Sequence, residues 1–311
     1  MLIRLVGLSL ISAVTVAAIC SDNAPRATAL PNGATAGDTT LPISAPAPAG
    51  SAIFVGAGDI ASCESAGDEA TAALLDSIPG TVFTLGDNEY ESGAPREYRD
   101  CYDPSWGRHK ARTRPVPGNH DYGTSGAAGY FGYFGSAAGD PRKGYYSFDL
   151  ADWHIIALND NIDHAAGSTQ EQWLRADLAA HKTLCTLAYW HAPRFSSGAE
   201  HGDDPSGKPL WQALYDANAD IVLGGHDHEY ERFLPQTPAG AADPVRGIRE
   251  FVAGTGGRSH YRLGRREANS EIFNATTFGV LKLTLSPGQY TWQFIPIAGQ
   301  SFTDSGSGVC H

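Results

Sequence analysis

Five short segments of the sequence carry side chains that can bind a metal ion. Each segment follows an apolar run typical of a buried β-strand. In chain order they are G-D-I with Asp59, G-D-N-E-Y with Asp87 and Tyr90, G-N-H-D with Asn119 and His120, Y-W-H-A-P with His191, and G-G-H-D-H-E-Y-E-R with His226 and His228. Because ligands of open α/β sheets lie beyond the carboxyl ends of strands, we expect these segments to converge on one dense site.

The types of these side chains indicate which metals suit such a site. None of the five segments contains cysteine, so a zinc finger or another thiolate site is not expected. Carboxylate, amide and imidazole donors together favour iron, manganese or zinc. His226 and His228 are two residues apart, so they point the same way on an extended chain, whereas on a loop they can serve two neighbouring metals.

The five segments, in this order, resemble the calcineurin-like metallophosphoesterase superfamily over roughly residues 52–294. They are most similar to its purple acid phosphatase branch. Tyr90 is the marker of that branch, in which a tyrosine three residues after the second aspartate is an Fe(III) ligand. Other members of the superfamily place a histidine two residues after the first aspartate, where this chain has Ala61.

Carried over position by position, the resemblance implies two metal ions. The first ion is expected at Asp59, Asp87, Tyr90 and His228. The second ion is expected at Asp87, Asn119, His191 and His226, so that Asp87 bridges the two. A phenolate donor favours Fe(III) at the tyrosine site, with Fe, Mn or Zn at the other. The alternatives are structural: Asp59 and Asp87 as turn residues at strand ends, and Tyr90 as a residue that packs against the sheet.

Two further histidines are catalytic candidates from the same resemblance. In the family, the histidine after the asparagine ligand lies over the substrate and helps to bind or protonate it, which implies this role for His120. His201 lies ten residues after His191. In plant purple acid phosphatases, a histidine at a similar distance after the corresponding ligand faces the leaving group. His201 is therefore the candidate general acid, since an imidazole titrates near about pH 6.5. The alternative for His201 is a solvated loop residue.

The resemblance implies a dinuclear-metal phosphoesterase, and the N-terminal segment described below implies that it is exported. We expect it to hydrolyse small phosphate monoesters, like an acid phosphatase, by attack of a metal-activated hydroxide. An alternative enzyme with the same ligands is a phosphodiesterase of the same fold that acts on phospholipid head groups or nucleotides. A surface binding module on a catalytically dead fold predicts missing ligands, yet every expected ligand position is filled. The sequence does not indicate an oligomeric state.

The elements that must position these residues alternate along the chain. Apolar runs predict buried strands at 52–58, 81–86, 185–190 and 221–224, and helical spacing predicts helices at 68–77 and 208–219. A helix that begins after Ser168 has a capping box with Glu171. Hairpins are expected from 145–149 with 153–158 and, later, from 280–285 with 290–294. The inventory fits an α/β fold, a four-layer α/β/β/α sandwich of two mixed sheets.

Composition and the N-terminal segment indicate where the protein acts. The net charge of −12 disfavours nucleic acid or an anionic membrane surface as a partner. Arg4 followed by the apolar run of residues 5–19 is typical of a secretory signal, predicted at 1–20, and no other run is long enough to span a membrane. The alternatives are a permanent membrane helix and a lipid anchor on Cys20. Residues 21–50 predict a disordered Pro/Ala/Thr-rich linker, and 51–311 the catalytic domain.

Four cysteines follow the predicted signal and suggest two disulfides in an exported chain. They are Cys63, Cys101, Cys185 and Cys310. Three pairings are possible, and we favour Cys63–Cys101 with Cys185–Cys310 because the first two lie in loops after neighbouring strands. Free buried thiols are the alternative.

Overall fold

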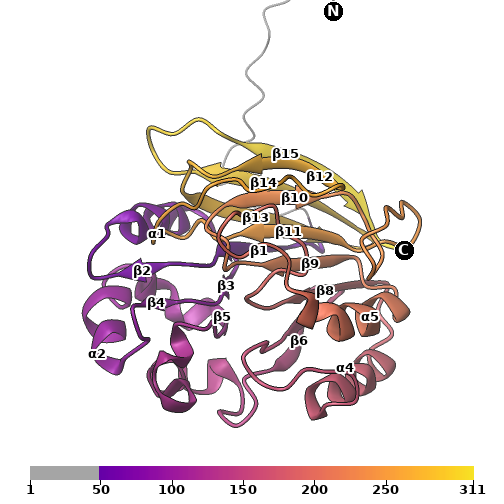
Figure 1. Ribbon diagram of the computed structural model, residues 1–311, viewed down its shortest axis with the longest axis horizontal. Helices are drawn as coiled ribbons and strands as arrows, with labels where there is room; N and C mark the ends of the chain where they lie inside the picture. The colour runs from indigo at the N-terminus through magenta and orange to yellow at the C-terminus, as the bar shows by residue number, and fades with distance from the viewer. Residues whose placement is uncertain (1–48) are drawn as a thin grey trace, which may run out of the picture. The chain divides into compact units, whose positions relative to one another are not determined.

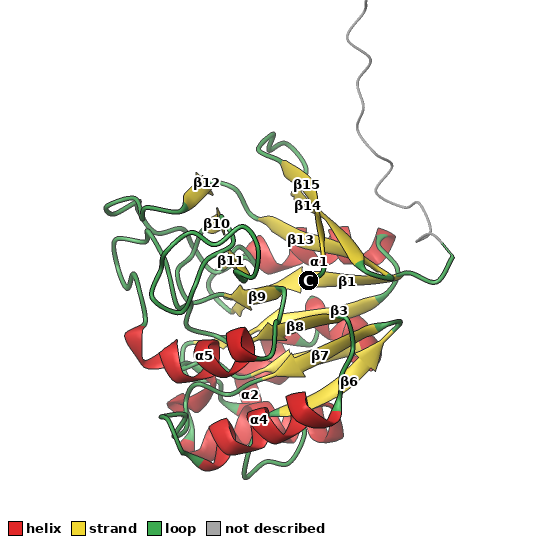
Figure 2. Cartoon of the chain, turned by 90° about the vertical axis from the view of Figure 1, so that its right-hand side faces the viewer, coloured by secondary structure: helices red, strands yellow, loops and turns green. Residues whose placement is uncertain are grey.

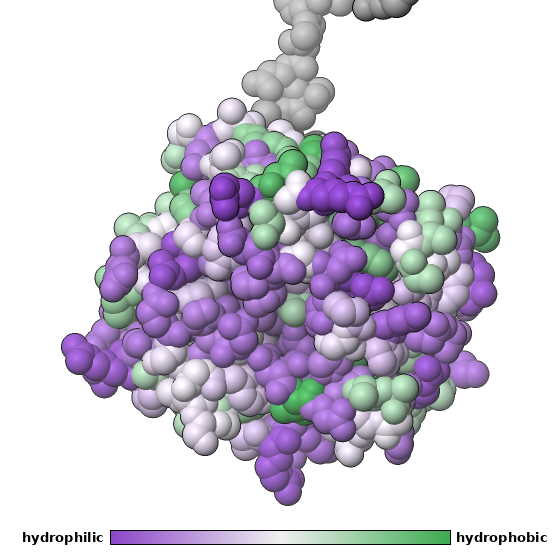
Figure 3. All heavy atoms as spheres, viewed as in Figure 1, coloured by the Kyte–Doolittle hydropathy of each residue, from purple (hydrophilic) through white to green (hydrophobic). Residues whose placement is uncertain are grey.

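The computed structural model describes residues 49–311. The predicted signal peptide, the possible lipid anchor at Cys20 and all of the predicted linker before residue 49 lie outside the described residues. Within 49–311, no helix has the length and apolarity required to cross a bilayer. The face in Figure 3 is mostly hydrophilic, with apolar residues in small scattered groups.

The described chain alternates strands with helices. The strands are β1 (Ala52–Ala57), β2 (Ala61–Ser62), β3 (Thr81–Leu85), β4 (Glu89–Tyr90), β5 (Thr113–Val116), β6 (Tyr146–Leu150), β7 (Trp153–Ala157), β8 (Cys185–Tyr189), β9 (Ile221–Gly224), β10 (Tyr230–Phe233), β11 (Arg249–Ala253), β12 (Ser270–Asn274), β13 (Gly279–Ser286), β14 (Gln289–Pro296) and β15 (Asp304–Val309). The α-helices are α1 (Gly67–Ser77), α2 (Pro95–Glu97), α3 (Ala128–Phe134), α4 (Thr169–Ala180) and α5 (Lys208–Asp216). Short 3₁₀ or π turns are η1 (Tyr98–Tyr102), η2 (Trp106–Arg112), η3 (Asp121–Gly123), η4 (Ser125–Ala127), η5 (Gly135–Ala138) and η6 (Pro205–Gly207).

Two mixed sheets form the centre of the fold. The first has the order β15-β14-β13-β1-β3-β5, and the second has the order β12-β10-β11-β9-β8-β7-β6. In the first sheet, β1, β3 and β5 are parallel and the C-terminal strands are antiparallel. In the second, β7, β8, β9 and β11 are parallel, with antiparallel strands at both edges. Each sheet therefore has a parallel part whose carboxyl ends open to one edge.

Helices cover the outer faces of both sheets. The inner faces meet in one apolar cluster that includes Phe54 and Leu283 from the first sheet and Leu187 from the second. The outer face of the first sheet packs on α1 and α3, and that of the second packs on α4 and α5. Figures 1 and 2 show these helices on opposite sides of the strands. The four-layer α/β/β/α prediction is confirmed.

Most of the predicted elements are present, and their ends have local causes. The Ser168 side chain accepts a hydrogen bond from the Glu171 amide at 3.2 Å, as the capping box requires. The Glu171 carboxylate, however, accepts from Gly167 rather than from Ser168. The helix expected over 208–219 ends at Asp216, because Asn218 adopts a left-handed conformation with φ of 59°, which terminates helices. The antiparallel edge strand β15 was not predicted, because its alternating serines and glycines lack an apolar pattern.

Both predicted disulfides are present. Cys63 pairs with Cys101 and Cys185 pairs with Cys310, with Cα–Cα distances of 5.2 and 5.3 Å. The first joins the loop after β2 to η1, and the second joins the start of β8 to the residue after β15. The favoured pairing is confirmed.

A buried histidine predicts a pH-dependent stability. His154 on β7 is 1% exposed and lies between Asp149 at 3.0 Å and Asp177 at 2.7 Å, with the His181 ring stacked on it. Burial alone would lower the pKa of His154, but the two carboxylates raise it above its ordinary value. A raised pKa stabilises the fold fully below the unfolded-state pKa of about 6.5, and this contribution is lost as pH rises through the folded-state pKa.

We therefore expect the free energy of unfolding to fall more steeply with rising pH in the native chain than in a His154→Gln variant. Urea unfolding at a series of pH values above about 6 measures both slopes. His164→Gln, at a partly exposed histidine that contacts no carboxylate in the described residues, is the matched control. Parallel curves for the native chain and His154→Gln would contradict the prediction.

Candidate metal centre

The five predicted segments converge at the carboxyl ends of the parallel strands. Asp59 follows β1, and Asp87 follows β3. Asn119 follows β5, while the second sheet contributes His191 after β8 and His226 after β9. Because the two sheets face each other, these ends meet at one edge of the sandwich. The fold therefore brings together side chains that are far apart in the sequence.

The first group of predicted ligands surrounds the hydroxyl of Tyr90. This hydroxyl lies 2.9 Å from Asp59 Oδ1, 2.9 Å from Asp87 Oδ2 and 3.1 Å from His228 Nε2. His228 Nε2 is also 3.4 Å from Asp59 Oδ1, and its Nδ1 contacts Ser259 Oγ at 2.7 Å. All four predicted ligands of this group are at most 3% exposed. Tyr90 thus points into the site and does not merely pack against the sheet.

The second group surrounds His191 Nε2. This nitrogen lies 3.0 Å from Asn119 Oδ1, 3.1 Å from His226 Nδ1 and 3.4 Å from Asp87 Oδ2. Asp87 is common to both groups, as the bridging assignment requires. The structure brings together all seven predicted ligands in the predicted partition.

The backbone at three of these residues is strained in a way that favours a functional site. Asp59, Asp87 and His226 have positive φ angles of 59°, 45° and 67°, which non-glycine residues seldom adopt. Such conformations cost about 1–3 kcal/mol each and cluster at functional sites. Gly118 is equally constrained, because a Cβ there would lie 2.2 Å from Asp87 Oδ1. The sharp turns aim the side chains inward, and the glycine leaves room for them.

Comparison with known proteins gives the family. The family model described as calcineurin-like phosphoesterase matches residues 46–230, more than half of the chain. The chain belongs to the calcineurin-like phosphoesterase family. All seven candidate ligands, from Asp59 to His228, fall within the matched residues, so the match covers the candidate metal centre.

Named relatives support the purple acid phosphatase branch of the family. Purple acid phosphatase 22 of Arabidopsis thaliana is 32% identical over 152 residues, which cover 47% of this chain and 35% of the relative. Purple acid phosphatase 15 of the same plant is 27% identical over 62% of this chain and 43% of its own length. The chain thus spans less than half the length of these curated relatives. The resemblance to the purple acid phosphatase branch, which Tyr90 indicated, is confirmed.

Two solved structures share the fold of this chain. Purple acid phosphatase PPD1 of yellow lupin has a TM-score of 0.63 at 19% identity, covering 83% of this chain and 53% of that one. GAP50 of Plasmodium, the anchor in the inner membrane complex, has a TM-score of 0.62 at 14% identity, covering 82% of this chain and 88% of that one. Because both sequence identities are below 25%, these similarities concern the fold and do not by themselves assign a function.

The pKa shifts of the candidate ligands indicate that the centre favours a bound cation. Burial alone would lower the pKa of His191, but Asp87 and Asp59 raise it well above its ordinary value. Burial and the same two carboxylates raise the pKa of Tyr90 well above its ordinary value. Burial and the neighbouring His191 lower the pKa of His226 to about 3, which keeps that imidazole neutral. Two buried carboxylates therefore attract a cation to this centre.

The hydrogen bonds of His191 test whether the residues fit metal ions. Its Nδ1 faces the Leu85 carbonyl oxygen at 2.7 Å, so Nδ1 carries the proton and donates it. Because the pKa of His191 is raised, Nε2 also carries a proton in the metal-free chain and faces two acceptors, Asn119 Oδ1 and Asp87 Oδ2. A metal ion that displaces this proton would meet the Nε2 lone pair and the same two oxygens. The donor set of carboxylate, amide, phenol and imidazole fits metal ions of the predicted kind.

The two predicted catalytic histidines lie at the opening of the centre. His120 is partly exposed, with its ring 4.3 Å from that of Tyr90 and its Nε2 3.9 Å from Asp87 Oδ2. Its Nδ1 lies 2.6 Å from the Glu91 carbonyl oxygen, which fixes the ring. His201 is exposed, and its ring stacks on that of His226 with 4.0 Å between centroids. Both reach the site from its solvent side.

A loop after β11, which begins with the G-T-G-G run of residues 254–257, completes the wall of the site. Tyr261 stacks on His228 with 3.9 Å between ring centroids, and Ser259 contacts the same imidazole. The Arg258 guanidinium lies 5.2 Å from the Tyr90 ring centroid and pairs with Glu91. The sequence carried a signal for this loop, because G-T-G-G directly follows a strand, as glycines do in other segments of the site.

Buried carboxylates hold the loop that carries His201. Asp227 accepts a hydrogen bond from the Gly202 amide at 3.0 Å and another from the Ser196 hydroxyl. Glu231 accepts from the Ser197 amide at 2.8 Å. Asp227 and Glu231 are both fully buried. Asp227, which lies between His226 and His228 in the sequence, therefore holds the loop that carries His201.

Proposed function

We propose that this protein is an exported hydrolase of small phosphate monoesters that uses two metal ions. The observation that carries the proposal is the convergence of seven donor side chains in two groups that share Asp87. Membership of the calcineurin-like phosphoesterase family supports phosphoester hydrolysis as the reaction class. The relatives named purple acid phosphatases support the tyrosine-containing form of the centre.

In this proposal, Asp59, Asp87, Tyr90 and His228 hold one ion, which we propose to be Fe(III). The residues Asp87, Asn119, His191 and His226 hold the other, which is Fe, Mn or Zn. When bound, such a pair of ions acidifies water and neutralises the charge of a transferring phosphoryl group. The chain itself fixes the geometry, because the strand ends and strained turns hold the donors in place.

The two histidines at the opening supply the remaining steps. His120, next to Asn119, is placed to bind a phosphate oxygen of the substrate. His201 is placed to donate a proton to the oxygen of the departing alcohol, which otherwise leaves as a high-energy anion. The hydrogen bonds that the loop amides donate to Asp227 and Glu231 reduce the freedom of His201 before substrate binds.

The proposal is tested by comparing esters that differ in leaving group. We expect the native protein to hydrolyse 4-nitrophenyl phosphate and phenyl phosphate. His201→Ala is expected to lower kcat for phenyl phosphate by about 100-fold, because a poor leaving group depends on proton donation. For 4-nitrophenyl phosphate, whose leaving group is stable as an anion, the loss is expected to be under about tenfold.

Steady-state kinetics with His164→Ala as the control measures these effects. Equal slowing of both monoesters by His201→Ala would remove His201 as the acid but leave the phosphatase proposal standing. Faster hydrolysis of bis(4-nitrophenyl) phosphate than of the monoesters would replace the monoesterase by the diesterase alternative. No hydrolysis of any ester by metal-loaded protein would revive the binding-module alternative.

A further inference from the structure

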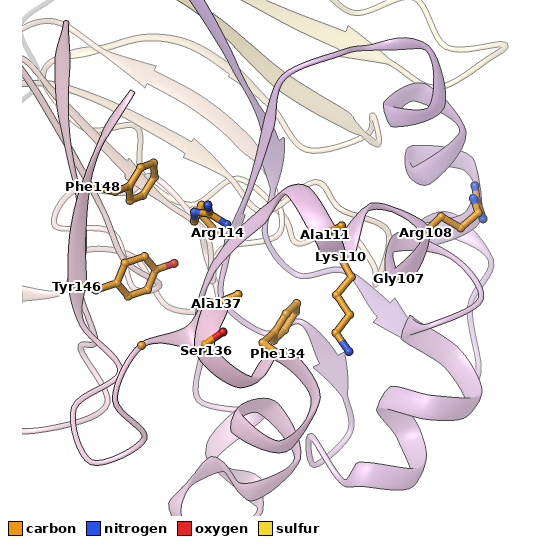
Figure 4. Close-up of a pocket in the computed structure, with 11 residues that line it drawn as sticks. Gly107, Arg108, Lys110, Ala111, Arg114, Phe134, Ser136, Ala137, Tyr146 and Phe148 are labelled. Atoms are coloured by element: carbon orange, nitrogen blue, oxygen red, sulfur yellow. The ribbon is translucent and has the colours of Figure 1, made fainter. Parts of the chain in front are cut away.

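A cavity of about 770 Å³ lies apart from the metal centre, and none of the candidate ligands lines it. It opens where the two sheets end side by side, because β5 and β6 are the edge strands of their sheets. Its principal side chains are Arg108, Lys110, Arg114, Phe134, Tyr146 and Phe148. We call it the edge cavity. Figure 4 shows Tyr146 and Phe148 on the same strand, with Arg114 opposite them.

One wall of the edge cavity is aromatic. Tyr146 and Phe148 are alternate residues of β6, so their rings lie on the same face, and they stack at 6.2 Å with an interplanar angle of 26°. Phe134 contributes a third ring to the lining. The wall offers a flat apolar surface for a planar ring.

The basic side chains that line the edge cavity differ in their partners within the chain. Arg108 is paired with Glu69 and Asp76, so its charge is balanced within the chain. Within residues 49–311, neither Arg114 nor Lys110 forms an ion pair with a carboxylate, although Lys110 Nζ lies 4.0 Å from the Tyr133 ring centroid. Arg114 lies 5.6 Å from the Phe148 ring centroid and donates one hydrogen bond, to the Thr113 carbonyl oxygen. Most of its donors remain available to a ligand.

The charge of the edge cavity is opposite to that of the chain as a whole. No Asp or Glu is among its lining residues, although the chain has a net charge of −12. Addition of a further β-strand to β5 is disfavoured, because the Pro115 carbonyl oxygen already accepts hydrogen bonds from Tyr130 and Tyr146. The cavity therefore presents side chains rather than a free strand edge.

The geometry points to a binding site for a small aromatic anion in the edge cavity. The ring of the ligand lies against Tyr146 and Phe148, and its carboxylate, sulfonate or phosphate group binds Arg114 and Lys110. A guanidinium group and planar rings recognise such a ligand together. The guanidinium group binds the anionic group of the ligand, and the aromatic rings shield the apolar face of the ligand ring from water. The site is independent of the proposed hydrolysis, since it contains none of the metal ligands.

The test uses the fluorescent aromatic anion 8-anilinonaphthalene-1-sulfonate as the probe. We expect saturable binding at one site per native chain, weakened about tenfold in Arg114→Gln and weakened in Lys110→Gln. Arg96→Gln removes the same charge at an exposed position elsewhere and is expected to bind like the native chain. The uncharged analogue N-phenyl-1-naphthylamine is expected to bind at least about tenfold more weakly.

The controls separate the edge cavity from other places where the probe can bind. Asp87→Asn, which disrupts the metal centre, is expected to leave the dissociation constant of the probe unchanged. Loss of binding in that variant would place the probe at the metal centre and overturn the inference. The inference would also be overturned if Arg114→Gln and the native chain bound the probe equally well, or if the charged and uncharged probes bound equally well. Thermal unfolding checks that Arg114→Gln is folded, and Lys110→Gln provides the same test at an exposed side chain.

Discussion

Replacing Asp87 with asparagine should remove both metal ions and lower kcat/KM for 4-nitrophenyl phosphate by at least about 1,000-fold. Asp87 Oδ2 lies 2.9 Å from the Tyr90 hydroxyl and 3.4 Å from His191 Nε2, so this one carboxylate serves both groups of donors. An amide cannot supply the negative charge that two cations share. Metal ions contribute several kcal/mol to phosphoryl transfer, and each 1.36 kcal/mol is about tenfold in rate.

Elemental analysis of the purified variant, together with kinetics, measures this effect. Asp220→Asn is the matched control, because Asp220 is also buried but precedes β9, whereas His226 follows that strand. We expect the control to retain about two metal ions per chain and most of its activity. Full retention of metal by Asp87→Asn would refute the bridging role.

The second large effect is expected in the visible spectrum. Purified native protein should show a broad tyrosinate-to-Fe(III) absorption band with about two metal ions per chain. Tyr90→Phe should lose the band entirely, because the Tyr90 hydroxyl lies among Asp59, Asp87 and His228 and is the phenol that the donors surround. Phenylalanine keeps the ring and removes only the ligand atom.

Tyr130→Phe provides the control for the spectrum. Tyr130 is fully buried and donates its hydroxyl hydrogen bond to the Pro115 carbonyl oxygen, outside the metal centre. Its variant should keep the band. Two metal ions without a band in the native protein would move Tyr90 away from the metal or indicate a different metal there. A band that survives in Tyr90→Phe would assign the absorption to another tyrosine.

The sequence by itself determined which residues meet at the centre. Hard donors follow one apolar strand after another, as in Asp59 after β1 and Asp87 after β3, and parallel strands must end at a common edge. The same local patterns predicted the hairpin of β6 with β7 and the N-terminus of α4 at Ser168. Cysteine number and placement favoured the observed disulfides. These features are local or follow from chain order, so a pattern in the sequence is enough to find them.

Only the tertiary structure decided the surroundings of the centre. Tyr261 and Ser259 contact His228, and Asp227 and Glu231 hold the loop that carries His201. These contacts join segments that no periodic pattern in the sequence connects. The edge cavity likewise depends on β5 and β6 being the last strands of two different sheets. Strand order and loop packing arise from the burial of apolar surface over the whole domain, which favours one arrangement through many weak contacts rather than through any one motif.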